Sequence, residues 1–346
     1  MSERNSEQKT DTKLFVSCHP SISKAKASTL QRSLKLTIPL QGTVARSIKI
    51  TGVGLHSGCL VNCWVHPAAA NTGILFKRID RSDSLLIKAD PFNITETTLS
   101  TTIGSGSSKV STIEHLMAAF YGLGIDNAYV EIDNEEVPIL DGSSAPFYDQ
   151  LSVVGTKVLN APKKSFVCEK PFEVKVGSSL MRVEPYPELF FECEIDFTSV
   201  SKAIGVQTLS FAYSDDMFKS VCEARTFCHV SDVNKMREMG LARGGSLDNA
   251  VVVDDEKVLN LEGLRFQDEF VRHKVLDCIG DLSMLGGHMV GKIILKRPGH
   301  ALTAEFTKTA FMHLAEYFSV AYGLRRDVQL SSNVAAPSFA MAVNQN

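Results

Sequence analysis

The chain has 346 residues, of which 44% are hydrophobic and 22% charged, so it is long enough for two ordinary globular domains. A net charge of −3 and an isoelectric point near 6.3 give no reason to expect nucleic acid as a partner. The uncharged stretch before Lys77 is interrupted by glycine, asparagine and proline, so it lacks the roughly 20 apolar residues of a membrane span. The eight cysteines form no C-x-x-C pair, which favours a reducing compartment, and we expect a cytoplasmic protein.

The two ends of the chain differ in composition from the middle. Ser, Thr, Lys and Gln dominate the start, and we expect residues 1–42 to form a disordered N-terminal extension. A transit peptide is the alternative, but Glu3, Glu7 and Asp11 place acidic residues where such peptides have few. We expect residues 326–346 to form a C-terminal tail.

Alternating apolar and polar residues predict a series of strands in the first half of the chain. These strands lie at about 47–51, 59–65, 73–77 and 127–132. The glycine-rich stretch 52–58 resembles a dinucleotide-binding motif, but its glycine spacing is wrong and a strand follows where a helix should, so we interpret it as a hairpin loop. Residues 96–108 are rich in Thr, Ser and Gly and predict a loop.

Residues 112–123 predict the first helix, with one apolar stripe for the core. His115 lies on the opposite face among small residues, which would let another element approach closely. Glu114 has two interpretations. Ser111 and Glu114 match the S-x-x-E capping box, in which the glutamate only binds a backbone N–H. Alternatively, Glu114 adjoins His115 and is placed to act as a general base beside a metal.

The second half repeats the order of strands followed by a helix. Its predicted strands lie at about 166–176, 180–184, 190–197, 250–253, 257–259 and 290–296, and its helices at about 215–224, 268–285 and 303–317. The helix at 268–285 places His273 and Asp277 one turn apart on one face, with Asp281 a turn further on. An imidazole and a carboxylate at this spacing are suitable ligands for zinc.

The shared order of elements suggests an internal duplication. The predicted domains are residues 43–162 and 165–320. We expect an α+β fold of two similar domains, with helices packed between two β-sheets. This packing would bring His115 to His273 and Asp277, giving the three protein ligands of a catalytic zinc site. With Glu114 beside the metal and His300 in a nearby turn, the set fits zinc-assisted hydrolysis.

Several short motifs occur in order along the chain: TGVGLHSG at 51–58, STIEHL at 111–116, GLGIDN at 122–127, PILDGS at 138–143, ARTF at 224–227, GGS at 244–246, GLRF at 263–266, EFVRHK at 269–274 with DL at 281–282, and GHAL at 299–302. In these motifs the sequence resembles the bacterial UDP-3-O-acyl-N-acetylglucosamine deacetylases, the zinc amidases of lipid A synthesis. The resemblance extends over about residues 43–318.

The resemblance implies two α+β domains that enclose their helices between two sheets. It implies zinc bound by His115, His273 and Asp277, with Glu114 as the general base on the attacking water. His300 would be the cationic general acid, and Asp281 would orient it. The other implied roles are oxyanion binding by Thr226, a catalytic and substrate contact by Lys274, and substrate contacts by Phe227, Leu55 and Gly245.

The resemblance also implies an inserted unit at about 240–263, beside an apolar passage for the acyl chain. His56 is expected to be a loop histidine with a backbone or phosphate contact, and its role stays open between a structural and a catalytic one.

The implied reaction removes the N-acetyl group of UDP-3-O-acyl-N-acetylglucosamine and releases acetate, the committed step of lipid A synthesis. We expect one zinc ion per chain, a monomer, and a small-molecule substrate that combines UDP, a sugar and an acyl chain. Two alternatives fit the residues less well. One is a non-catalytic, zinc-stabilised binding module, and the other is a zinc peptidase, against which the absence of an H-E-x-x-H run argues.

Overall fold

The computed structural model describes residues 39–324. The predicted C-terminal tail and nearly all of the predicted N-terminal extension lie outside the described residues. The last three residues of that extension, 40–42, belong instead to strand β1 (Leu40–Val44), which pairs antiparallel with β10 (Thr156–Pro162). The described part of the chain is a mixed α+β structure with several sheets.

The first sheet has five strands in the order β2-β3-β9-β4-β5. Their bounds are β2 (Ile48–Val53), β3 (Leu60–Pro67), β9 (Ala128–Ile132), β4 (Ile74–Arg78) and β5 (Ile87–Lys88). All neighbours are antiparallel except β4 and β9, which are parallel. Val61, Cys63 and Val65 of β3 point into the core because alternate residues of a strand face the same side. The stretch 52–58 forms the hairpin between β2 and β3, as predicted.

The second sheet contains seven strands. Their bounds are β11 (Lys164–Cys168), β12 (Phe172–Val176), β13 (Ser179–Glu184), β14 (Leu189–Asp196), β15 (Val206–Ala212), β18 (His288–Lys296) and β19 (Phe318–Tyr322). Five of them follow the path β12-β13-β18-β14-β15. Only β18 and β14 are parallel along that path, so its pairing pattern is the same as that of the first sheet.

Shorter strands complete the structure. They are β6 (Ile94–Glu96), β7 (Thr102–Ser105), β8 (Ser108–Val110), β16 (Phe227–His229) and β17 (Val251–Val253), with the 3₁₀ turn η1 (Pro91–Asn93). The prediction of a loop at 96–108 was therefore wrong, because β7 and β8 form a hairpin there. β16 and β17 pair in parallel around a helix, so the strand–helix–strand unit begins at Phe227, before the predicted insert at 240–263.

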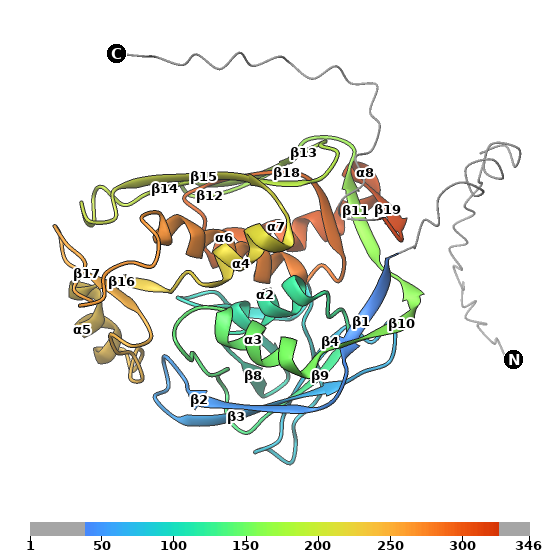
Figure 1. The fold of residues 1–346 in the computed structure, drawn as a ribbon, viewed down its shortest axis with the longest axis horizontal. Helices are drawn as coiled ribbons and strands as arrows, with labels where there is room; N and C mark the ends of the chain where they lie inside the picture. Colours follow the sequence, from blue (N-terminus) through green and yellow to red (C-terminus); the bar gives the residue numbers. More distant parts are fainter. Residues whose placement is uncertain (1–38, 325–346) are drawn as a thin grey trace, which may run out of the picture. The chain divides into compact units, whose positions relative to one another are not determined.

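The helices are α2 (Glu114–Leu123), α3 (Ala145–Val154), α4 (Asp215–Cys222), α5 (Val230–Glu238), α6 (Glu269–Ser283), α7 (His300–Met312) and α8 (Leu314–Tyr317). Apolar residues of α2 and α3 share a core with the first sheet, and those of α6 and α7 share a core with the second sheet. Figure 1 shows α2 and α6 next to each other between these sheets.

The contact between α2 and α6 depends on Gly280. A Cβ atom at this position would lie 2.1 Å from the backbone oxygen of Glu114. The two helix backbones therefore touch two turns after His273 and one turn after Asp277, where any larger residue would separate them.

We expect Gly280→Ala to destabilise the fold by about 1–3 kcal/mol, because overpacking of a rigid backbone contact outweighs the better helix propensity of alanine. Denaturant unfolding measures the free energy of unfolding. Gly299→Ala is the control, because no described atom lies within 4 Å of an added methyl group there. An unchanged or higher stability for Gly280→Ala would contradict the close contact.

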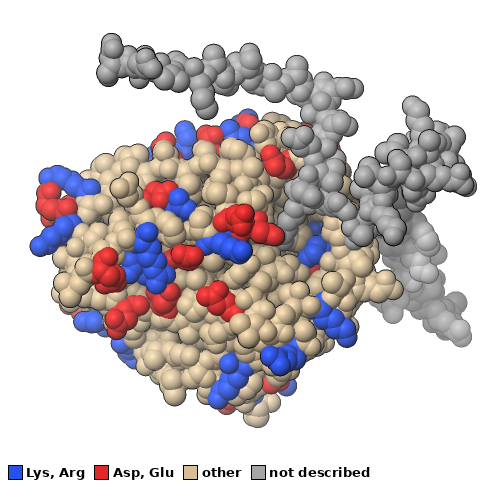
Figure 2. All heavy atoms as spheres, viewed as in Figure 1, with Lys and Arg blue, Asp and Glu red and all other residues tan. Residues whose placement is uncertain are grey.

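None of the helices in the described residues is long and apolar enough to cross a membrane. On the face drawn in Figure 2, acidic and basic side chains are interspersed.

Candidate metal centre and active site

Three buried side chains from two helices meet beside the α2–α6 contact. His273 and Asp277 project from one face of α6, and His115 is the second residue of α2. Asp277 Oδ1 lies 3.3 Å from His273 Nε2 and 3.5 Å from His115 Nε2. Ligand atoms 2.0–2.2 Å from a tetrahedral zinc ion lie about 3.3–3.6 Å apart, so these separations fit one ion. The predicted convergence of the three residues is confirmed.

The protonation states of His273 and Asp277 suit the binding of a cation. His273 Nδ1 lies 3.0 Å from the backbone oxygen of Ala224, so it carries the proton and leaves the Nε2 lone pair free. Burial is the main cause that lowers the pKa of His273 to about 3. Burial opposes the charge of Asp277, but neighbouring positive charge, including that of Lys274, outweighs it and holds the pKa of Asp277 well below the usual range.

Asp277 Oδ1 itself supplies the test of whether a metal fits. It is buried and has no hydrogen-bond partner among the described residues. A buried carboxylate oxygen without a partner is costly, and a cation between it and the two imidazoles would remove that cost. Two neutral imidazoles and one carboxylate are a donor set that zinc accepts, with a fourth position left for a reactant.

Glu114 lies next to this cluster and is not a helix cap. The capping-box interpretation is wrong, because α2 begins at Glu114 itself and its N-cap residue, Ile113, makes no side-chain bond. Glu114 Oε2 instead accepts a hydrogen bond of 3.0 Å from the backbone N–H of Thr101. Its other oxygen lies 3.7 Å from His300 Nε2. Burial raises the pKa of this carboxyl, so it is a better proton acceptor than an exposed glutamate.

His300 faces Glu114 across the cluster. It was predicted in a turn, but it is the first residue of α7, after the N-cap Gly299. Its Nδ1 lies 3.0 Å from Asp281 Oδ2, and its Nε2 lies 3.9 Å from Asp277 Oδ2. Burial opposes its charge, but Asp281 and Glu114 outweigh this effect and raise the pKa of His300 to about 9. His300 is therefore an imidazolium at neutral pH.

Two threonines that the sequence did not single out hold Asp281. Thr101 donates a hydrogen bond of 2.7 Å to Asp281 Oδ1, and Thr303 donates to Oδ2. Thr101 lies in the Thr- and Ser-rich run that was expected to be a loop, so no sequence signal distinguished it from its neighbours. These bonds fix the carboxylate that faces His300.

Lys274 and Phe227 lie at the edge of the cluster. Lys274 Nζ donates to Asp277 Oδ2 at 3.0 Å and lies 5.4 Å from the centre of the Phe227 ring. The same ring contacts His273, with ring centres 6.1 Å apart. The neighbouring Thr226 is fixed by its backbone N–H, which donates to Gly142 O at 2.7 Å.

A cavity of about 390 Å³ opens beside Phe227. Leu55, Thr226, Phe227 and Gly245, all predicted to contact the substrate or the oxyanion, line it. The other walls are mostly apolar and come from β16, α5, β17 and the segments on either side of β17; they include Val230, Val233, Met236, Leu247, Val252 and Leu259.

His56 also lines this cavity, from the β2–β3 hairpin. Glu136 holds the hairpin by accepting hydrogen bonds from the backbone N–H groups of His56 and Ser57, at 2.8 and 2.7 Å. Both ring nitrogens of His56 are buried without a hydrogen-bond partner in the described part of the chain. These contacts account for the position of the loop and leave the function of the ring open.

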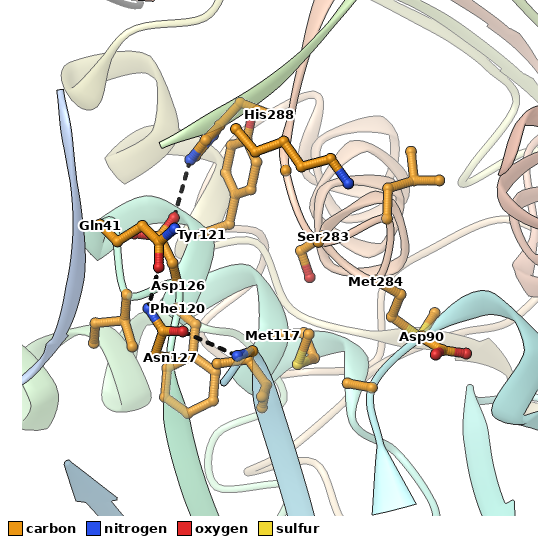
Figure 3. A pocket seen from close by; sticks show the side chains of 18 of the residues that line it. Gln41, Asp90, Met117, Phe120, Tyr121, Asp126, Asn127, Ser283, Met284 and His288 are labelled. Carbon is orange, nitrogen blue, oxygen red and sulfur yellow. Dashed lines mark hydrogen bonds and ion pairs between the residues drawn. The ribbon is translucent and has the colours of Figure 1, made fainter. Parts of the chain in front are cut away.

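A second cavity, of about 300 Å³, lies near the other ends of α2 and α6. Figure 3 shows Phe120 and Tyr121 on one side of it and Ser283 and Met284 on the other. None of the predicted site residues lines this cavity. The predicted site residues therefore gather at the opposite ends of these helices, which carry His115 and His273.

Comparison with known proteins identifies the family. The family model for LpxC, UDP-3-O-acyl N-acetylglycosamine deacetylase, matches residues 41–312. The chain belongs to this deacetylase family. A family member from Acidithiobacillus ferrooxidans is 46% identical over 288 residues, which cover 83% of this chain and 94% of that protein. One from an Anaeromyxobacter species is 41% identical over 299 residues, covering 86% and 94%. Both are named UDP-3-O-acyl-N-acetylglucosamine deacetylase.

Proposed function

We propose that this chain is a zinc-dependent amidohydrolase that removes the N-acetyl group of UDP-3-O-acyl-N-acetylglucosamine, the committed step of lipid A synthesis. The observation that carries the proposal is the buried meeting of three metal ligands with a carboxylate and an imidazolium. His115, His273 and Asp277 would hold the zinc ion. When bound, the zinc ion acts as a Lewis acid and lowers the pKa of water.

Glu114 and His300 divide the proton transfers between them. Glu114 takes the proton of the attacking water, because it is the carboxylate beside the ligands that does not itself bind metal. His300 stabilises the developing negative charge and gives a proton to the departing amine. Asp281 accepts the Nδ1–H of His300 and keeps Nε2 directed at the reacting atoms.

The remaining residues bind the substrate. Thr226 donates a hydrogen bond to the oxyanion, and Lys274 contacts the substrate with its charged end. Phe227 packs against the sugar, and Leu55 and Gly245 contact the part of the substrate that enters the cavity. The apolar walls of the 390 Å³ cavity bind the acyl chain.

The acyl assignment predicts the effect of filling the cavity. We expect Leu259→Trp to lower kcat/KM for a long-chain 3-O-acyl substrate about tenfold or more relative to a short-chain one, because the indole takes the space of the chain. Leu261→Trp is the matched control, since Leu261 is fully exposed two residues away. An equal loss for both chain lengths would place the acyl chain elsewhere.

The reaction itself is tested by acetate release from UDP-3-O-acyl-N-acetylglucosamine. We expect release by the zinc-loaded protein, loss on treatment with a chelator, and recovery on adding back one equivalent of zinc. Metal analysis gives the stoichiometry independently. A zinc-loaded protein that releases no acetate from this substrate would overturn the proposal.

We also propose that the fold arose by duplication, with domains at 43–162 and 165–320 that enclose their helices between two sheets. The support is the common strand path: β2-β3-β9-β4-β5 and β12-β13-β18-β14-β15 have the same directions, and α2 and α6 each precede the central strand. The β16–α5–β17 unit is an insertion into the second domain.

A single chain suffices for this chemistry, because it supplies all the proposed ligands and proton carriers, and we propose a monomer. The cysteines between residues 39 and 324 are all free. This usage supports a cytoplasmic location, where thiols stay reduced and nucleotide-linked sugars are available.

A further inference from the structure

Residues 224–226, which we call the 224–226 strap, join α4 to β16 beside the metal cluster. The backbone oxygen of Ala224 accepts the hydrogen bond that sets the His273 ring, and Thr226 is the proposed oxyanion donor. The strap therefore links a metal ligand to a substrate contact. Its position depends on how Arg225, the residue between them, is held.

Arg225 is bound by a carboxylate with no exposed surface. Glu269, the first residue of α6, is 0% exposed. Its Oε1 accepts hydrogen bonds from Arg225 Nε at 2.8 Å and from the Arg225 backbone N–H at 3.1 Å. Its Oε2 accepts from Arg225 Nη2 at 3.2 Å and from the Arg265 backbone N–H at 2.6 Å. One carboxylate thus fixes both the side chain and the backbone of the strap.

All three nitrogens of the Arg225 guanidinium donate hydrogen bonds. Nη1 donates to Glu262 at 2.7 Å and Nη2 donates to the backbone oxygen of Gly263 at 2.8 Å. A planar group with these bonds in fixed directions cannot turn without breaking several of them. The side chain is also nearly buried, so water cannot replace the lost partners.

One contact fixes the other side of the strap directly: the backbone N–H of Thr226 donates to Gly142 O at 2.7 Å. Arg265, whose backbone N–H binds Glu269, ties the same loop to this end of α6, because its Nη2 donates to Asp141 at 2.8 Å. The loop is packed closely at Gly142, since a Cβ there would lie 2.1 Å from the backbone oxygen of Asn249. The strap is therefore held between α6 and the loop that contains Asp141 and Gly142.

The geometry points to a positioning role for the Arg225–Glu269 pair, which sets the angle of the His273 ring and the place of Thr226. Glu269 and His273 lie one turn apart on α6, and they bind neighbouring residues of the strap, Arg225 and Ala224. Because the strap is attached to α6 at both residues, its position along the helix affects how the His273 ring is oriented toward a metal ion. The part of the inference that concerns Thr226 rests on the proposed deacetylase function.

The test compares Glu269→Gln and Arg225→Lys with the unmodified protein. Zinc affinity is measured by competition with a chelator, and kcat and KM are measured on the zinc-saturated proteins. We expect zinc to bind about 10–100-fold more weakly and kcat to fall by a similar factor, as for other groups that orient metal ligands. KM should change less, because the cavity walls are intact.

Arg78→Lys is the matched control for stability. Arg78 is also buried and paired with a carboxylate, Asp80, but it lies on β4 and lines neither cavity. We expect it to lower the free energy of unfolding without changing zinc affinity or kcat. A double variant, Arg225→Met with Glu269→Leu, removes both buried charges and keeps the fold testable if Glu269→Gln does not fold. We expect it to keep the weak zinc binding, because the backbone bonds to Glu269 stay lost.

Folded Glu269→Gln, or the folded double variant, with zinc affinity and kcat within about twofold of the unmodified protein would overturn the inference. Failure of the proposed function has a different signature. In that case the unmodified protein would bind zinc and release no acetate, while the difference in zinc affinity between it and the variants would remain.

Discussion

Glu114→Gln is expected to lower kcat for acetate release by about 10²–10⁴-fold, the usual contribution of a general base. Glutamine has nearly the same shape and can still accept the hydrogen bond from the backbone N–H of Thr101, but it cannot take a proton. Zinc content should stay at one per chain, because Glu114 is not among the three ligands. The measurement is a kinetic assay combined with metal analysis of the same preparation.

Glu305→Gln is the control for the loss of a carboxylate, because Glu305 is exposed on α7. It should keep full activity. If Glu114→Gln retained activity within about threefold, the general-base assignment would be wrong. If it lost its zinc instead, Glu114 would belong to the ligand set.

His300→Gln is expected to have the second large effect, a fall in kcat of about 10²–10⁴-fold with zinc retained. The imidazolium lies 3.7 Å from Glu114 and 3.9 Å from Asp277, and glutamine carries no charge. The change therefore removes charge stabilisation and the proton for the departing amine together.

His313→Gln tests whether the effect belongs to this position. His313 is exposed at the end of α7, where its contact is with Glu316, and its replacement should leave kcat unchanged. Zinc loss in His300→Gln would indicate a metal ligand rather than a proton donor. Unchanged kcat would remove His300 from the reaction.

The metal ligands were predictable because their spacing depends on helix periodicity alone. His273 and Asp277 share a face in any α-helix, and the small residues around His115 indicated a close neighbour. The glycine in the α6 face, Gly280, proved to be the contact point between the two helices. Spacing alone could not show which helix His115 would contact. The internal duplication inferred from the order of elements indicated that helix.

The interpretation of Glu114 could not be decided from the sequence, because S-x-x-E fits a cap and a general base equally. The backbone decides it. Thr112 has φ of +55°, so the chain turns there and the helix begins two residues later than the capping box requires. A left-handed threonine is uncommon, and nothing in its neighbours predicts it.

Other differences have similar local causes. β7 and β8 were missed because their buried positions include Thr102 and Ser108, small polar residues that show no apolar alternation. The Arg225–Glu269 pair was missed because its partners are 44 residues apart in sequence. The sequence did show that Glu269 lies one helical turn before His273 on the same helix face, and this spacing could have indicated a residue that acts together with His273.

The division of the metal ligands between α2 and α6 has a consequence for the physical behaviour of the protein. His115 and His273 are far apart in the sequence. A bound ion therefore cross-links distant parts of the chain, and does so only in the folded state. Zinc binding is then coupled to folding by mass action, and the unfolding midpoint rises with free zinc concentration. The half of the chain with α2 or the half with α6 would by itself carry at most two of the three ligands, so its folding would not be coupled to zinc binding in this way.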